Sequence, residues 1–68
     1  MFRNIRAEQA RIGMTNEEMA KALGISRPTY ESKKRTGKFT ASEAASLCKL
    51  FNVSFDYLFS TDRPSELK

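Results

Sequence analysis

The stretch MTNEEMAKALGISRPTY, residues 14–30, decides the fold of this 68-residue chain. Thr15 and Glu18 have the spacing of a capping box, in which each side chain accepts a hydrogen bond from the other residue's backbone N–H. This pattern predicts a helix over 16–23. The helix should end at Gly24, because glycine readily adopts the left-handed conformation that closes a helix.

A second helix is expected to begin almost at once. Ser26 is a good N-cap for a helix over 27–35. Ala20 is small enough to let this second helix come close to the first, and Tyr30 would anchor it in the core. Two helices joined by so short a turn must cross at a steep angle. Residues 14–30 therefore predict a helix-turn-helix.

Three further helices are expected around this pair, and the chain has little strand signal. They are a helix over 2–11 that ends at Gly13, a helix over 41–51 that begins with the capping box of Thr40 and Glu43 and ends at Asn52, and a short helix that follows Ser54. Gly37 should end the helix that carries Tyr30. The helix over 41–51 has apolar residues at helical spacing, which are Ala44, Leu47, Cys48 and Phe51. We therefore predict an all-α fold of five helices, with one compact domain over 1–59 and a flexible polar tail over 60–68.

The composition narrows the possible functions. Hydrophobic residues make up 40% and charged residues 29% of the chain, which is ordinary for a globular domain. The sequence has one cysteine and no histidine, so we expect no internal disulfide, no zinc site of the usual kind and no nucleophile paired with histidine. It also has no apolar run long enough to span a membrane, and residues 1–6 lack the apolar core of a signal peptide. We expect a cytoplasmic protein that is not an enzyme and needs no cofactor.

Positive charge is concentrated in one part of the chain. The net charge is +4, and residues 27–38 alone hold five basic residues and one acidic residue. A basic block on a small domain with a pI near 9.6 is typical of a surface that binds a polyanion. The alternative is a solvated segment with scattered lysines.

Residues 14–30 also resemble the helix-turn-helix of phage-repressor-like regulators, the Xre or Cro-type family. The usual run of that family is Leu-Thr-Gln-Glu-Glu-Leu-Ala, two variable residues, Leu-Gly-Val-Ser and then the recognition helix. Phe39-Thr40 and the run LFNVSFDYLF at 50–59 resemble the family's fourth and fifth helices, so that the resemblance covers about residues 4–59. It implies a compact five-helix, phage-repressor-like domain that binds double-stranded DNA sequence-specifically, usually as a dimer on inverted repeats, and regulates transcription, most often as a repressor.

The resemblance places the first residues of the helix over 27–35 in the major groove. The candidate base-reading residues are Arg27, Pro28, Thr29 and Ser32. Arg27 is the strongest of them, because a guanidinium can bond guanine O6 and N7 together. Its alternative roles are a phosphate contact or a surface salt bridge with Glu31. The candidate phosphate contacts are Asn16, Lys33, Lys34, Arg35 and Lys38.

Several residues depart from the family pattern. Asn16 stands where the family prefers glutamine, and Lys33 stands where many members have an aliphatic residue. Pro28 replaces a polar side chain in the first turn of the recognition helix, which the helix tolerates because first-turn N–H groups have no partner within the helix. The run at 34–38 also differs from the usual one, which leaves the end of this helix open.

Two matters stay open at the level of sequence. A homodimer, at least on DNA, would need an apolar patch, and Tyr57, Leu58 and Phe59 are the candidates, although they would serve equally well in the core. The alternative function is a protein-interaction module, such as an antitoxin or the partner of an anti-repressor, with DNA binding as a secondary activity.

Overall fold

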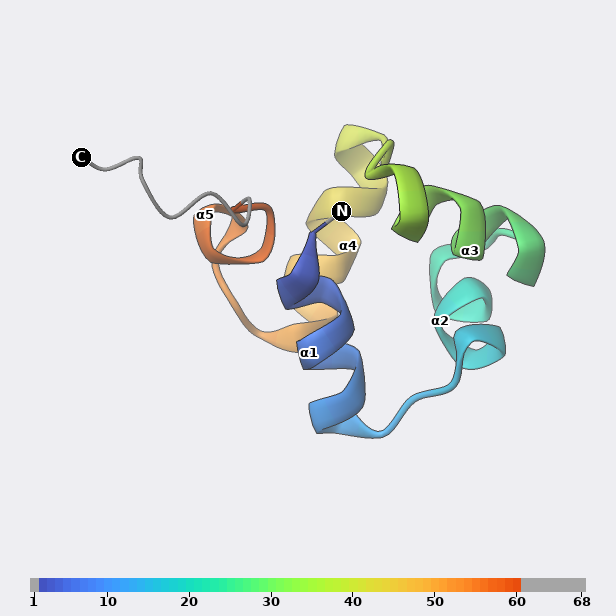
Figure 1. Cartoon of the computed structure of the whole chain (residues 1–68), viewed down its shortest axis with the longest axis horizontal. Coiled ribbons are helices and arrows are strands. Elements are labelled where there is room, and N and C mark those ends of the chain that lie inside the picture. Colours follow the sequence, from blue (N-terminus) through green and yellow to red (C-terminus); the bar gives the residue numbers. More distant parts are fainter. Residues whose placement is uncertain (1, 61–68) are drawn as a thin grey trace.

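The computed structural model describes residues 2–60, and these form five helices (Figure 1). The helices are α1 (Arg3–Ile12), α2 (Asn16–Leu23), α3 (Arg27–Thr36), α4 (Ala41–Phe51) and α5 (Phe55–Leu58). No strand occurs within this part of the chain. The expected all-α, five-helix fold is confirmed. The expected tail lies, apart from Ser60, outside the described residues, as does Met1.

Side-chain caps begin the helices where the sequence predicts them. The Thr15 Oγ1 accepts the Glu18 backbone N–H at 3.1 Å, and Glu18 Oε1 accepts the Thr15 N–H at 2.9 Å. The capping box of α4 has the same two bonds, at the same two lengths. The expected closing residues of α1 to α4 all have positive φ angles, including Asn52 with φ 58°. Helix α3 reaches Thr36, one residue further than expected, because Gly37 supplies the left-handed residue.

One core lies between the helices. Its fully buried members come from all five: Ile5, Met19, Ala20, Tyr30, Leu47, Phe51 and Leu58. Helices α2 and α3 pack against each other, and α1 and α4 lie between this pair and α5 (Figure 1). The small Ala20 is 2% exposed, as the close approach of α2 and α3 requires. This packing fixes α3 to the rest of the domain by one face only, and leaves its other face exposed.

The apolar residues in and around α5 are not all exposed, as the candidate dimer patch would require. Leu58 is completely buried inside the chain, so it is a core residue and is not available to a dimer partner. Phe55, by contrast, is 58% exposed. Tyr57 is 41% exposed, and its hydroxyl donates to Glu8 Oε2 at 2.8 Å. Phe59 is half-buried and packs its ring on Phe2 at 5.2 Å between centroids.

Among residues 2–60, no helix has the length and apolar character needed to cross a bilayer.

Candidate nucleic-acid interface

The exposed side of α3 is built at its first turn. Ser26 caps the helix, with its Oγ accepting the Thr29 backbone N–H at 3.3 Å and donating to Thr29 Oγ1 at 2.8 Å. Pro28 lies in the first turn, where its missing N–H leaves no bond unmade. All four candidate base-reading residues, Arg27, Pro28, Thr29 and Ser32, are exposed.

The structure brings three of these four residues together. Pro28, Thr29 and Ser32 line a shallow hollow of about 490 Å³ along α3, and its remaining lining residues are Lys33, Thr36 and Lys38. Arg27 lies on the side of α3 that faces α2, in a separate hollow that also includes Thr15 and Lys21. The candidates are thus divided between two hollows along the exposed side of α3 and the loop after it, and we call this exposed surface the strip on α3.

Arg27 is paired with Glu31 in this structure. Its Nη1 lies 3.3 Å from Glu31 Oε2, and the two side chains are 57% and 41% exposed. An exposed ion pair of this kind contributes about 0–1 kcal/mol, so DNA can compete for the guanidinium. The pair uses one of five guanidinium N–H donors. Base reading and ion pairing by Arg27 are therefore compatible.

The candidate phosphate contacts have unequal surroundings. Arg35 and Lys38 are exposed. The Lys33 ammonium instead lies 3.2 Å from Glu43 Oε1, so it connects α3 to the beginning of α4. The Lys34 ammonium donates to Asn16 Oδ1 at 2.7 Å. In the free protein, two of the lysines are thus held against the domain and are not extended into solvent.

A buried glutamine, for which the sequence predicts a place on the apolar face but no contacts, joins α1 to both helices of the helix-turn-helix. Gln9 Nε2 donates to the Met14 carbonyl and to Asn16 Oδ1, both at 2.9 Å. Its Oε1 accepts the Tyr30 hydroxyl at 2.7 Å and the Lys34 ammonium at 3.1 Å. The available signal was its position four residues after Ile5, which places a polar amide on the apolar face of α1.

Burial sets the protonation of two partners of Gln9. Desolvation raises the pKa of Tyr30 to about 12, so its hydroxyl remains a donor through the neutral and alkaline range. Desolvation, assisted by the charge of Arg6, lowers the pKa of Lys34, while Glu31 opposes that shift. The Lys34 ammonium also lies 5.1 Å from the centroid of the Tyr30 ring, which is within the range of a cation–π contact.

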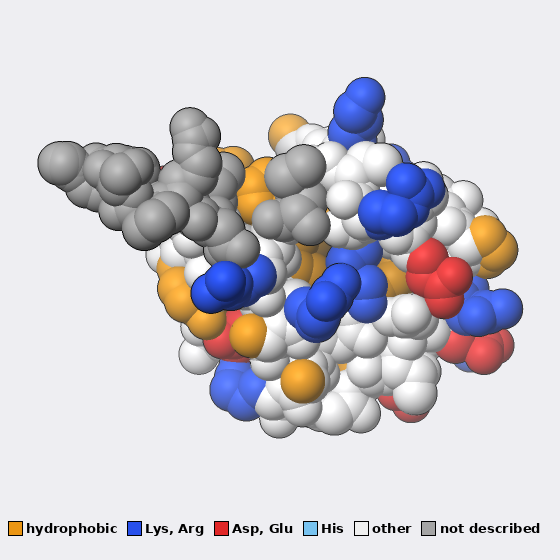
Figure 2. Space-filling view, viewed as in Figure 1, with side chains coloured by type: hydrophobic (Ala, Val, Ile, Leu, Met, Phe, Trp, Pro, Cys, Tyr) orange, Lys and Arg blue, Asp and Glu red, His pale blue; other side chains and the backbone are white. Residues whose placement is uncertain are grey.

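Basic side chains spread over the face formed by α1 and α3 (Figure 2). The exposed basic residues on these two helices include Arg3, Arg6, Arg27 and Arg35. Arg11, also on α1, bonds Glu8 and the Phe51 carbonyl, at 2.5 and 2.9 Å. The guanidinium of Arg11 is therefore paired within the domain. This face has the positive charge that an electrostatic contact with a polyanion requires.

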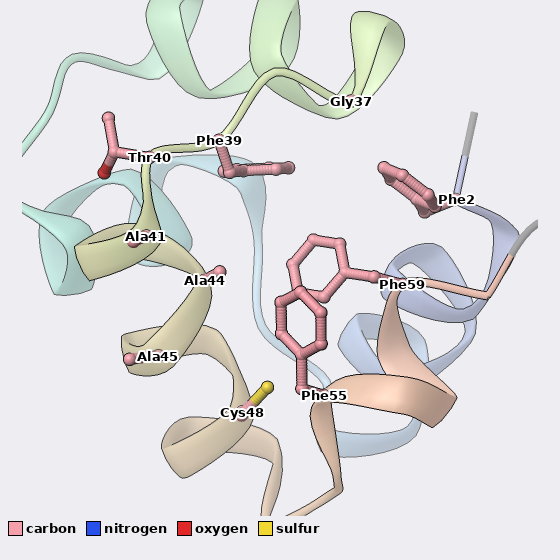
Figure 3. A pocket seen from close by; sticks show the side chains of 10 residues that line it. All are labelled: Phe2, Gly37, Phe39, Thr40, Ala41, Ala44, Ala45, Cys48, Phe55 and Phe59. Atoms are coloured by element: carbon pink, nitrogen blue, oxygen red, sulfur yellow. The ribbon is translucent and has the colours of Figure 1, made fainter.

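A third hollow, of about 720 Å³, has a different chemistry (Figure 3). Within residues 2–60 its lining has no charged side chain; the lining residues are Phe2, Gly37, Phe39, Thr40, Ala41, Ala44, Ala45, Cys48, Phe55 and Phe59. The rings of Phe55 and Phe59 lie 4.8 Å apart, and Phe39 continues the cluster to Tyr30 of α3, with its centroid 6.3 Å from the Tyr30 ring. Nothing in the sequence predicted that these residues, from four parts of the chain, would meet.

A family model matches residues 2–51, which contain α1 to α4; its description is an antitoxin Xre-like helix-turn-helix domain. The chain belongs to this Xre-like helix-turn-helix family. No curated protein and no solved structure matches the chain. The expected resemblance is confirmed at this level, and family membership indicates a DNA-binding regulator or an antitoxin. Helix α5 lies beyond the matched residues.

We expect this Xre-like helix-turn-helix domain to lose stability in acid. Hydrogen bonds from Arg11 and Tyr57 lower the pKa of Glu8, and the Thr40 N–H and Lys33 lower the pKa of Glu43. A carboxyl with a lowered folded-state pKa stabilises the fold above its unfolded pKa, near 4.5, and this contribution disappears as the pH falls through the folded value.

Urea unfolding at a series of pH values below 5 should therefore show a falling free energy of unfolding. The Glu43→Gln variant should show a weaker dependence on pH in that window, and the exposed Glu17→Gln variant should behave like the parent. An equally steep fall in the Glu43→Gln variant would contradict this assignment.

Proposed function

We propose that this domain is a sequence-specific DNA-binding repressor that places α3 in the major groove of double-stranded DNA. The observation that carries the proposal is the exposed strip on α3, where Arg27, Pro28, Thr29 and Ser32 lie beside exposed basic side chains. The major groove admits one α-helix, and hydrogen bonds to base edges there distinguish all four base pairs. In this arrangement Arg27 reads guanine, Pro28 contacts a thymine methyl group, and Thr29 and Ser32 bond base edges.

The phosphate contacts fix the position of α3 in the groove. Arg35 and Lys38 are exposed and need no rearrangement to reach the DNA backbone. Lys33 would exchange its present partners for a phosphate oxygen, whereas Asn16 and Lys34 each have one further N–H and would add a phosphate oxygen to their present partners. Such contacts supply affinity for all sequences and make binding depend on salt concentration.

We further propose that the domain binds as a homodimer. One recognition helix reads about four or five base pairs, which is too few to mark a site in a genome. A two-fold axis doubles the site and places half-sites about 34 Å apart. Tyr57 and Phe59 remain candidates for the interface, and the exposed Phe55 adds apolar surface beside them. Selection of bound sequences from a random DNA pool should then return an inverted repeat.

The Arg27→Ala variant tests the base-reading role. The measured quantity is the ratio of the affinity for the selected site to that for a site with the contacted guanine replaced. We expect Arg27→Ala to lower this ratio about 5- to 150-fold, because one good bidentate contact discriminates by about 1–3 kcal/mol. Arg35→Ala is the matched control, since it removes the same charge from the same helix. It should weaken binding to both sites alike. Equal weakening by Arg27→Ala would assign that residue to a phosphate.

The Lys38→Ala variant tests the electrostatic contact at the end of α3. Each lost phosphate contact should reduce the slope of log affinity against log salt concentration by about one. Lys49→Ala in α4 removes the same charge from an exposed position outside α3 and its following loop. It should leave the slope as it is in the parent. If the two variants have the same slope as the parent, then the loop after α3 faces away from DNA.

The second candidate function is a protein-binding antitoxin. The family description supports it, and the aromatic hollow, which begins at Gly37 and Phe39 beside the end of the strip, offers an apolar surface. A partner protein bound there would form a stoichiometric complex in the absence of DNA, and the Arg27→Ala variant would form it equally well. Size-exclusion chromatography of the co-expressed proteins, after nuclease treatment, distinguishes this function from DNA binding alone.

A further inference from the structure

We propose that Glu31 and Asn16 position Arg27 for base reading, through a relay of hydrogen bonds that begins at the buried Gln9 of α1. This inference rests on the proposed function, and it adds residues that determine specificity without touching a base. The relay runs from α1 through the first residue of α2 to the first turn of α3. It gives Asn16 a role beyond the phosphate contact that its position suggests.

The first step of the relay is fixed because Gln9 has no spare hydrogen-bonding capacity. Its two N–H groups have two acceptors, the Met14 carbonyl and Asn16 Oδ1. Its oxygen has two donors, the Tyr30 hydroxyl and the Lys34 ammonium. An amide can make four such bonds, and a flip of Gln9 would oppose two oxygens at the Met14 carbonyl and two donors at the Lys34 ammonium. Gln9 is also 9% exposed, which keeps competing water away.

The second step fixes the orientation of Asn16. Its Oδ1 accepts from Gln9 at 2.9 Å and from Lys34 at 2.7 Å. With the oxygen committed to two donors, the amide nitrogen must face the other way. There it donates to Glu31 Oε2 at 3.1 Å. The direction of every bond from α1 to Glu31 is thus set by the saturated amide of Gln9.

The third step holds Arg27. The same oxygen of Glu31 that accepts from Asn16 lies 3.3 Å from Arg27 Nη1. An ordinary exposed pair at this spacing on a helix holds its partners weakly, since both side chains must give up rotamer freedom to meet. Here the carboxylate is already anchored by α2. Only Arg27 has to be ordered, and part of that ordering precedes DNA binding.

Pre-ordering of this kind contributes to specificity. A guanidinium held in one direction can meet the two acceptors of guanine with its remaining N–H groups, but it cannot follow an alternative base as readily. A mobile arginine would bond whichever acceptor or phosphate oxygen lies within reach. The relay therefore predicts that loss of Glu31 lowers the discrimination between bases more than it lowers the affinity.

The experiment compares the selected DNA site with the same site after replacement of the guanine that Arg27 contacts. We expect Arg27→Ala to lower the ratio of the two affinities about tenfold. Glu31→Ala should lower the ratio at least threefold, and Asn16→Asp should do the same, because its second carboxylate oxygen repels Glu31. Since only the ratio is compared, uniform effects of charge on DNA affinity cancel.

Two controls separate positioning from charge and from direct reading. Asp56→Ala removes the same charge from an exposed position on α5, outside the hollow that holds Arg27, and it should leave the ratio at the parent value. In the Arg27→Ala background, Glu31→Ala should cause no further loss, because there is no arginine left to position. A further loss in that background would show that Glu31 reads a base itself, and would overturn the inference.

The remaining outcomes are also decisive. If Glu31→Ala changes the affinity for both sites alike, as Asp56→Ala does, and keeps the ratio, then Glu31 is a surface charge and the relay has no role in specificity. The proposed function survives that result. If Arg27→Ala itself leaves the ratio unchanged, or if the parent selects no sequence, the proposed function fails at its base-reading step and the inference fails with it.

Discussion

Replacing Gln9 with leucine is expected to lower the free energy of unfolding by about 2–4 kcal/mol, because buried polar groups left without partners cost about 1–3 kcal/mol each. The change leaves the Tyr30 hydroxyl without its acceptor and Asn16 Oδ1 without one of its two donors. It also removes the side-chain bond to the Met14 carbonyl. Leucine fits the site in size, so lost hydrogen bonds rather than lost volume should account for the effect.

A double variant distinguishes this explanation from simple misfit. Tyr30→Phe removes the orphaned hydroxyl, so the Gln9→Leu/Tyr30→Phe protein should recover about 1 kcal/mol relative to Gln9→Leu alone. Urea unfolding followed by circular dichroism measures both values. A domain of this size has a total stability of about 3–10 kcal/mol, so the single change should displace the unfolding midpoint clearly. Additive losses in the double variant would contradict the proposed bond between the two side chains.

The second large effect is expected at Leu58. Its side chain is completely buried, and Leu→Ala changes in cores cost about 2–5 kcal/mol. Helix α5 has only four residues, and Leu58 is its one buried side chain, so the loss of Leu58 should weaken the docking of α5 on α1 and α4. The matched control is Phe55→Ala in the same helix, at a side chain that is 58% exposed.

The dependence on protein concentration decides between a core and an interface role. A core residue should give the same loss of thermal stability at every concentration, whereas an interface residue should give a loss that varies with concentration by mass action. We expect the first behaviour for Leu58→Ala. A melting temperature that rises with protein concentration in the parent but not in the variant would instead assign Leu58 to the dimer interface.

Local chemistry explains why so much of the fold could be predicted. The caps of α2 and α4 depend on residues three apart, and the closing residues depend on a single left-handed position. The buried stripe of α4 depends on spacing within one helix, and Ala44, Leu47 and Phe51 are buried as expected. Each of these signals involves residues that lie within about one to two helical turns of one another in the sequence.

The site could be predicted only in part, because its side chains are placed by partners that are distant in sequence. Lys34 and Asn16 are 18 residues apart, and Tyr57 and Glu8 are 49 apart. No pattern within one helix indicates these contacts. Lys33 illustrates the difficulty: the sequence predicts it as a phosphate contact, but the first turn of α4 brings Glu43 beside its ammonium. The assignment of base and phosphate contacts remains a prediction for the same reason.

The bonds of Gln9 have a consequence for how the domain opens. When α1 separates from its neighbours, the Tyr30 hydroxyl and the Lys34 ammonium lose an acceptor at the same moment. The slowest backbone amides of α1 and α3 should therefore exchange with deuterium at one common opening free energy, as a single cooperative unit. Helix α5 has no bond to that amide and should exchange earlier. Helix α3, which is proposed to read DNA, should therefore open only when α1 opens.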